Sequence, residues 1–395
     1  MFFSIAQQYK DNFSKFYELG SFKISTDAGW TEFKQDGHSV LYKGYADSDK
    51  LASLLDQIIS QKEPEFLGNF CALVYSVKSG TLRIQTDRYR SFPIYFDATQ
   101  ITNLFRLDNT AWTDSLIEIN TDLTVVESKF DVIGPIDITP TTVDDAVNRI
   151  NIILEEKTQK FIRYVDRPIK TFISGGVDSL LVYSYLQRYT DNFELIKGQH
   201  IDYDEFWLKN SGTLRTLWGY TQIHHWNDPC VLTSGAPGDE FMLRSPVTVD
   251  LFLKLQDRSM ITLLNQDRWK GCLHQTYFNL PKHYTIFADD GVLPVWNREQ
   301  MMWNLCNILL NDWQHWHLGN TLTWTPLRDL EIIKLLLRLP VDDALGQIMN
   351  SDISCRLIEQ NKSGLTGVIS DQKNAGNSMK NLVNFYFKAS ENSTQ

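Results

Sequence analysis

The residues whose types and spacing point to chemistry lie between an expected strand and an expected helix. The segment 168–173 is typical of a short buried strand, and 179–187 carries apolar residues at helical spacing. The residues that join them are two serines, two glycines, a valine and an aspartate: Ser174, Gly175, Gly176, Val177, Asp178 and Ser179. Strand, glycine turn and helix form the start of an α/β unit.

This run has the properties of a phosphate-binding loop. Glycines let the backbone turn tightly and approach a ligand, and the N–H groups at a helix N-terminus attract anions. Ser174 and Ser179 add hydroxyl donors, whereas Asp178 would repel a bare phosphate. Magnesium between carboxylate and phosphates removes that repulsion. The run therefore predicts binding of nucleotide phosphates with Mg²⁺, and it is not a Walker A loop because it lacks the GKS or GKT ending.

A second acidic position follows another glycine-containing loop. Gly235, Pro237 and Gly238 precede the neighbouring carboxylates Asp239 and Glu240. A carboxylate here that faced Asp178 would complete a magnesium site on a pyrophosphate group. The alternative interpretation is a solvated acidic turn.

The hexapeptide resembles the PP-loop of the ATP pyrophosphatases, which cleave ATP between its α and β phosphates. Further segments in the same order are similar to the asparagine synthetase family over about residues 35–380. These segments are Phe66–Phe70, Thr86–Arg88 and Pro93–Tyr95 toward the N-terminus, then Asp202–Glu205, Val231–Glu240 and Thr325–Asp329.

The resemblance implies a fold and a division of the chain. Residues 1–138 would form an N-terminal-nucleophile-like β-sandwich, a degenerate glutamine amidotransferase-like domain. Residues 139–388 would form an α/β PP-loop synthetase domain, adenine nucleotide α-hydrolase-like, with a helical C-terminal half. The polar tail 389–395 is expected to be disordered. Two prolines within 133–140 agree with a linker between the domains.

The resemblance also implies site residues, with ATP and Mg²⁺ as cofactors. Asp178 and Asp239 would be magnesium ligands. The residues implied to bind ATP and pyrophosphate are Ser174, Gly175, Gly176, Val177, Asp178, Ser179, Ser234 and Gly235. A catalytic lysine that stabilises charge on the adenylate and pyrophosphate is best matched by Lys373, with Lys362 as the rival.

Several positions depart from the family pattern. Phe2 stands where glutamine-dependent members carry their cysteine nucleophile, and Cys71 lies in a strand pattern typical of a buried residue. Glutaminase activity is therefore expected to be absent, as in β-lactam synthetases and lasso-peptide cyclases. Leu322 replaces a glutamate implied to handle the amine, and Met242–Arg244 replaces a glycine pair.

The function that follows is amide formation by an ATP-dependent carbon–nitrogen ligase. A carboxylate substrate, aspartate by family default, would be converted to an acyl-adenylate with release of pyrophosphate, and an amine or ammonia would displace AMP. One alternative is a β-lactam-synthetase-like or lasso-cyclase-like ligase that uses a substrate amine. Another is a nucleotide-binding pseudoenzyme that regulates a partner.

Composition excludes several other classes. The 395 residues are 43% hydrophobic and 22% charged, with a net charge of −10, which favours a globular protein and disfavours nonspecific nucleic-acid binding. Five scattered cysteines without a CxxC pair argue against a zinc ribbon and a disulfide scaffold, and they suit the cytoplasm. The chain has no signal-peptide pattern and no apolar run long enough to span a membrane. A homodimer is left open.

The patterning also predicts individual elements. Residues 1–135 indicate mostly strands and turns, including a strand at 39–46 and a hairpin turn at Lys78–Gly80. Helices are expected at 48–61 and, capped by Thr141 or Thr142, at 141–155. Helical patterns dominate about residues 250–340.

Overall fold

A computed structural model provides the structure of the chain. The residues that it describes are 3–11, 13–46, 51–60, 68–90, 94–103, 109–111, 115–129, 131–173, 176–196, 229–235, 237–245, 248–249, 252, 302, 306 and 322–361. Within these ranges the chain is a mixed α/β protein, with antiparallel sheets toward the N-terminus and a parallel sheet with helices toward the C-terminus.

Two antiparallel sheets make up the first part of the described chain. In spatial order, the strands of one are β10 (Asn109–Thr110), β8 (Tyr95–Phe96), β9 (Gln100–Thr102), β1 (Phe3–Ala6), β3 (Phe22–Thr26) and β2 (Lys15–Leu19). Those of the other are β12 (Val125–Lys129), β11 (Ser115–Ile119), β7 (Leu82–Thr86), β6 (Gly68–Ser76), β5 (His38–Ala46) and β4 (Thr31–Gln35). Apolar side chains of both sheets enter one hydrophobic core.

Strand β6 is buried on both faces because a helix covers its outer side. Cys71 and Leu73 point into the core shared by the two sheets. Ala72 and Val74, on the alternate face, belong to a second cluster with α1 (Leu51–Ser60). A strand covered on both sides has a nearly continuous apolar sequence, which is the pattern of this segment.

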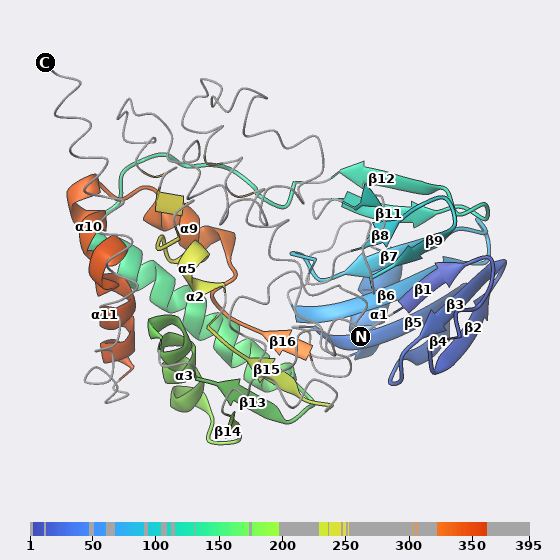
Figure 1. Ribbon diagram of the computed structural model, residues 1–395, viewed down its shortest axis with the longest axis horizontal. Helices are drawn as coiled ribbons and strands as arrows, with labels where there is room; N and C mark the ends of the chain where they lie inside the picture. The colour runs from blue at the N-terminus through green and yellow to red at the C-terminus, as the bar shows by residue number, and fades with distance from the viewer. Residues whose placement is uncertain are drawn as a thin grey trace, which may run out of the picture.

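The second part of the described chain is built on a parallel sheet. Its strands are, in spatial order, β14 (Glu194–Ile196), β13 (Ile169–Phe172), β15 (Val231–Thr233) and β16 (Leu322–Trp324). The helices that accompany it in the described ranges are α2 (Val143–Tyr164), α3 (Val177–Tyr189), α5 (Gly238–Phe241), α9 (Leu330–Leu336), α10 (Val341–Asn350) and α11 (Asp352–Gln360). Figure 1 shows these elements on one side of the molecule and the antiparallel sheets on the other.

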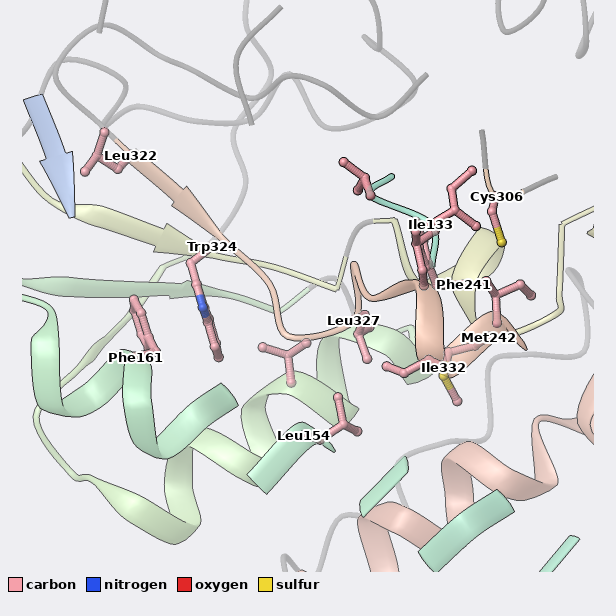
Figure 2. Packing of buried hydrophobic residues seen from close by; sticks show 14 of the residues in the cluster. Ile133, Leu154, Phe161, Phe241, Met242, Cys306, Leu322, Trp324, Leu327 and Ile332 are labelled. Atoms are coloured by element: carbon pink, nitrogen blue, oxygen red, sulfur yellow. The ribbon is translucent and has the colours of Figure 1, made fainter. Parts of the chain in front are cut away.

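Helix α2 forms where the sequence predicts it and runs further. The Thr142 hydroxyl accepts a hydrogen bond from the Asp145 amide, so the expected cap is confirmed. Its buried residues recur at helical spacing and end with Phe161: Ala146, Val147, Ile150, Leu154, Thr158 and Phe161. Phe161 lies beside Trp324 of β16, so α2 is packed directly on the parallel sheet (Figure 2).

Direct contacts join the two parts of the chain. The Asn69 side-chain amide in β6 donates to the Thr323 carbonyl in β16 at 2.6 Å. The Arg328 guanidinium donates to the Tyr89 carbonyl at 2.7 Å. Buried residues from both parts belong to one continuous hydrophobic cluster, so the two parts pack against each other through a shared apolar core.

Most predicted elements agree with the structure. Gly80 occupies the expected hairpin turn with φ of 70°, residues 131–142 are irregular as expected of a linker, and α3 begins two residues before the predicted helix. The helical prediction for 250–340 is wrong at Leu322–Trp324, which form β16. Tertiary pairing with β15 overrides the local pattern there. The predicted segments at 202–205 and 389–395 lie outside the described residues.

Candidate functional site

Two neighbouring parallel strands bring the predicted loops together. β13 pairs with β15 so that Thr171 lies opposite Thr233, and the two hydroxyls hydrogen bond at 2.9 Å. Because the strands are parallel, the loops that follow them leave the same edge of the sheet. One leads into α3 and the other into α5, so residues more than 50 positions apart meet at this edge. This edge is where open α/β sheets bind ligands.

The loop after β13 ends at the N-terminus of α3. Gly176 is the N-cap with an extended backbone, and Asp178 lies in the first turn. The Ser179 hydroxyl donates to the Gly176 carbonyl at 2.8 Å and so stabilises the start of the helix. Val177 is buried at 1% exposure, which makes it a core residue rather than a side-chain ligand.

The loop after β15 approaches this helix start through two glycines. A Cβ at Gly235 would lie 2.3 Å from the Ser179 amide nitrogen. A Cβ at Gly238 would lie 2.4 Å from the Asp178 carboxyl carbon. Only glycine allows such a close approach because it has no Cβ. These two glycines therefore set the distance between the loop and the first turn of α3.

Helix α5 places Asp239 next to Asp178. Asp239 lies in its first turn, and Phe241 and Met242 at its end are fully buried in the hydrophobic cluster (Figure 2). The short helix is thus held by its apolar end while Asp239 remains 56% exposed at the edge. The two predicted metal ligands are therefore brought together, with Asp178 the more buried at 15% exposure.

An arginine that the sequence did not single out lies between these carboxylates. Arg244 Nη1 lies 3.0 Å and 3.1 Å from the two carboxylate oxygens of Asp178. The same nitrogen lies 3.4 Å from Asp239 Oδ1. Arg244 is itself 10% exposed, so it forms a largely buried ion pair with Asp178. The Arg244 guanidinium therefore interacts with both acidic side chains.

The electrostatics of the cluster are dominated by burial. Burial raises the pKa of Asp178, the Arg244 guanidinium opposes this rise, and the neighbouring Asp239 carboxylate adds to it, for a result of about 7. Burial lowers the pKa of Arg244, but Asp178 and Asp239 outweigh burial and raise it overall. A further positive group would favour ionised Asp178.

The backbone around Arg244 is held in a defined turn. Leu243 has φ of 58°, in the left-handed region that residues other than glycine seldom adopt. The Arg244 and Ser245 amides both donate to the Asp239 carbonyl, at 2.7 Å and 2.8 Å. The Gln347 side chain of α10 donates to the Met242 carbonyl at 2.8 Å. These bonds turn the chain back, so that Arg244 reaches Asp178.

The structure thus assembles only part of the predicted set. It brings together Gly176, Asp178, Ser179, Gly235 and Asp239, and Ser234 directly follows β15. The residues Ser174, Gly175, Lys362 and Lys373 lie outside the described residues.

Arg244 is the residue that sequence reasoning missed. Its only signal was the presence of Met242–Arg244 where a glycine pair was expected.

The two carboxylates fit magnesium as it is bound alongside phosphates. Mg²⁺ commonly takes one or two carboxylates together with substrate phosphate oxygens, and Asp178 and Asp239 supply two within reach of one cation. In the described part of the chain, no group of three or more His, Cys, Asp or Glu side chains is arranged to hold a metal without other ligands. This donor set thus suits a metal that arrives with a phosphate group.

Leu322 and Cys71, two residues that the sequence analysis singled out, are both buried in the structure. Leu322 is fully buried in the core where it pairs with Val231, so its side chain supplies no polar group. Cys71 is fully buried in β6, as the strand pattern predicted. Burial raises the pKa of its thiol, so it is held in the unreactive protonated form.

No protein-family profile matches this chain, and neither does any curated protein. In the described residues, no helix is both long and apolar enough to cross a membrane.

Proposed function

We propose that the chain is an ATP-dependent carbon–nitrogen ligase that forms amides and releases AMP and pyrophosphate. The main observation behind this proposal is that Asp178 and Asp239 lie close together. They follow two adjacent parallel strands and lie beside the N-terminus of α3. The proposed fold is a PP-loop synthetase domain preceded by an N-terminal-nucleophile-like sandwich, and the described sheets agree with it.

The proposed reaction takes place in two steps. A substrate carboxylate oxygen attacks the α-phosphorus of ATP, the α–β phosphoanhydride bond breaks, and pyrophosphate leaves. An amine then attacks the acyl carbon, loses a proton and displaces AMP. Helix α3 would attract the phosphates through its N-terminal amides. The close approach at Gly235 holds the loop after β15 against the first turn of this helix. Mg²⁺ held by Asp178 and Asp239 would supply neutralisation of phosphate charge.

The amine in this proposal is ammonia or a group of the substrate itself. The fully buried Cys71 cannot serve as a glutaminase nucleophile in this conformation. The apolar Leu322 supplies no carboxylate to handle an amine. These observations favour a ligase that does not draw ammonia from glutamine. Aspartate is the first carboxylate to test.

Exchange of labelled pyrophosphate into ATP tests the first step directly. The purified chain, Mg²⁺ and ATP are incubated with individual carboxylates, aspartate among them, with EDTA as the metal-free control. We expect exchange with at least one carboxylate and none in EDTA. Asp178→Asn and Asp239→Asn should each reduce the exchange by about 10²–10³-fold or more.

Asp144→Asn is the matched control. Asp144 is an exposed carboxylate in the first turn of α2, paired with Arg356 on the surface. Loss of the Asp144 charge should leave pyrophosphate exchange unchanged. Wild-type exchange in Asp239→Asn would reject the two-carboxylate site. Nucleotide binding without exchange for any carboxylate would indicate a nucleotide-binding regulatory protein instead.

A further inference from the structure

Arg244 places a single positive nitrogen where three carboxylate oxygens converge. Its Nη1 lies 3.0 Å and 3.1 Å from the oxygens of Asp178 and 3.4 Å from Asp239 Oδ1. With Asp178 only 15% exposed, removing this cation would leave a largely buried charge without compensation. The guanidinium is thus the counter-charge of the pair in this structure.

A divalent metal and this guanidinium cannot share the same position. Mg²⁺ requires its oxygen ligands at about 2.0–2.1 Å, in a near-octahedral arrangement that leaves no room for a nitrogen bound to the same oxygens. A metal that bridges Asp178 and Asp239 must therefore displace Arg244. Free Mg²⁺ would have to break a largely buried ion pair, whereas a metal bound to nucleotide also brings phosphate oxygens to which a displaced arginine can bind.

The surrounding contacts hold Arg244 at this position. The amides of Arg244 and Ser245 both bond to the carbonyl of Asp239, the residue that its side chain also contacts. Leu243 is fully buried with φ of 58°, so its conformation is maintained by packing as well as by hydrogen bonds. The main chain of Asp239 and the side chain of Arg244 are therefore parts of one turn.

We propose that Arg244 is a resident counter-cation that excludes free divalent metal from Asp178 and Asp239, so that metal enters only together with nucleotide phosphates. This role rests on the proposed function, because it concerns the same metal site. It makes metal binding depend on nucleotide, and it prevents occupation of the site by metal alone. The arginine then becomes available to contact the phosphates.

Binding of Mn²⁺, followed by electron paramagnetic resonance, tests this role without any turnover. Mn²⁺ is titrated into the full chain with and without the non-cleavable analogue α,β-methylene-ATP. The wild type should bind Mn²⁺ in the cluster only with the analogue. Arg244→Gln should bind Mn²⁺ alone, with an affinity increased by about tenfold or more over the wild type.

Three further variants separate the effect of charge from other effects. Arg244→Lys keeps a cation and should still exclude free Mn²⁺. Arg356→Gln removes the same charge from an exposed ion pair with Asp144 and should behave as the wild type does. Asp239→Asn in the Arg244→Gln background should lose the new Mn²⁺ binding, which places that binding in the cluster.

A second measurement uses the folded wild type, in case Arg244→Gln does not fold. The Nε–H signal of Arg244, assigned by its loss in Arg244→Lys, is followed by NMR in arginine-labelled protein. It should shift with Mg²⁺ and the analogue together, and not with Mg²⁺ alone.

The outcomes distinguish this inference from the proposed function. Equal Mn²⁺ affinity in the wild type and Arg244→Gln without nucleotide, or an Arg244 signal that does not move when metal and analogue bind, overturns the inference alone. Absence of Mn²⁺ from the cluster in every variant, with analogue present, rejects the metal site and both proposals.

Discussion

The ring of Phe161 lies parallel to the indole of Trp324, with 3.9 Å between ring centroids and 10° between planes. Phe161 belongs to α2 and Trp324 is the last residue of β16, so the stacked rings join the helix to the sheet. Phe161 also makes a T-shaped contact with Tyr45 of β5, at 5.7 Å between centroids. One side chain thus contacts both parts of the described chain.

Removal of this ring should therefore be costly. Phe161→Ala removes a fully buried aromatic side chain and leaves a cavity, and we expect a loss of about 3–5 kcal/mol in the free energy of unfolding. Ile152→Ala is the control on the same helix, because Ile152 is 53% exposed, and it should change stability by about 0.5 kcal/mol or less. Urea unfolding followed by tryptophan fluorescence measures both. Equal losses in the two variants would contradict the importance of the stack.

Gly235→Ala should disrupt the site through backbone collision. The new Cβ would lie 2.3 Å from the Ser179 nitrogen and 2.5 Å from the Asp178 carbonyl carbon, so the loop or the start of α3 must move. We expect a loss of about 1–3 kcal/mol in stability and the loss of pyrophosphate exchange.

The matched control is Gly346→Ala in α10. The three atoms nearest to its Cβ would all belong to the side chain of Asp352, which is exposed and can rotate away. Helix propensity favours alanine by about 1 kcal/mol, so this variant should be as stable as the wild type or more so. Wild-type exchange in Gly235→Ala would show that the close approach is not required.

Cys71 should be unreactive in the native protein. Burial raises the pKa of its thiol, so raising the pH from 7 to 9 leaves it protonated, whereas an exposed thiol ionises over this range. In the native proteins, a thiol reagent should label the same number of cysteines in the wild type and in Cys71→Ala. In guanidinium chloride, the number of labelled cysteines should be one lower in the variant. A native count that differs by one at pH 9 would place Cys71 within reach of solvent.

The Lys157–Asp329 pair should be important because it is buried. The two charged groups lie 2.9 Å apart, with side chains 11% and 10% exposed, and Asp329 also caps α9. Lys157→Met strands the Asp329 charge and should cost about 3–5 kcal/mol of stability. Adding Asp329→Asn removes that charge while keeping a capping side chain, so part of the loss should be recovered.

The exposed pair Lys23–Glu18 provides the comparison. Its side chains are 30% and 58% exposed, so Lys23→Met should cost much less stability than Lys157→Met. Thermal unfolding measures all three variants. No recovery in the Lys157→Met/Asp329→Asn variant would contradict the stranded-charge explanation.

The sequence was informative where local chemistry determines structure. Gly235 and Gly238 were predicted to form a loop ahead of Asp239 that could bring this carboxylate to face Asp178, and the structure places both glycines against the first turn of α3. Residue type predicted Thr141 or Thr142 as a helix cap, and the structure shows that Thr142 is the cap.

What the sequence could not provide depends on tertiary structure. Arg244 reaches Asp178 because Leu243, a residue with no intrinsic preference for positive φ, turns the chain back. Strand β16 is three residues long and exists because it pairs with β15, which no local pattern records. The bond from Asn69 to Thr323 joins residues 254 positions apart.

The shared apolar core has a consequence for how such a chain can evolve. Tyr45 and Asn69 supply contacts to α2 and β16, so the first part of the chain covers surface that the second part would otherwise expose to water. Selection would therefore act to retain the antiparallel sheets even if they carried out no reaction of their own, because a gene shortened to the second part would encode a protein with an open hydrophobic face.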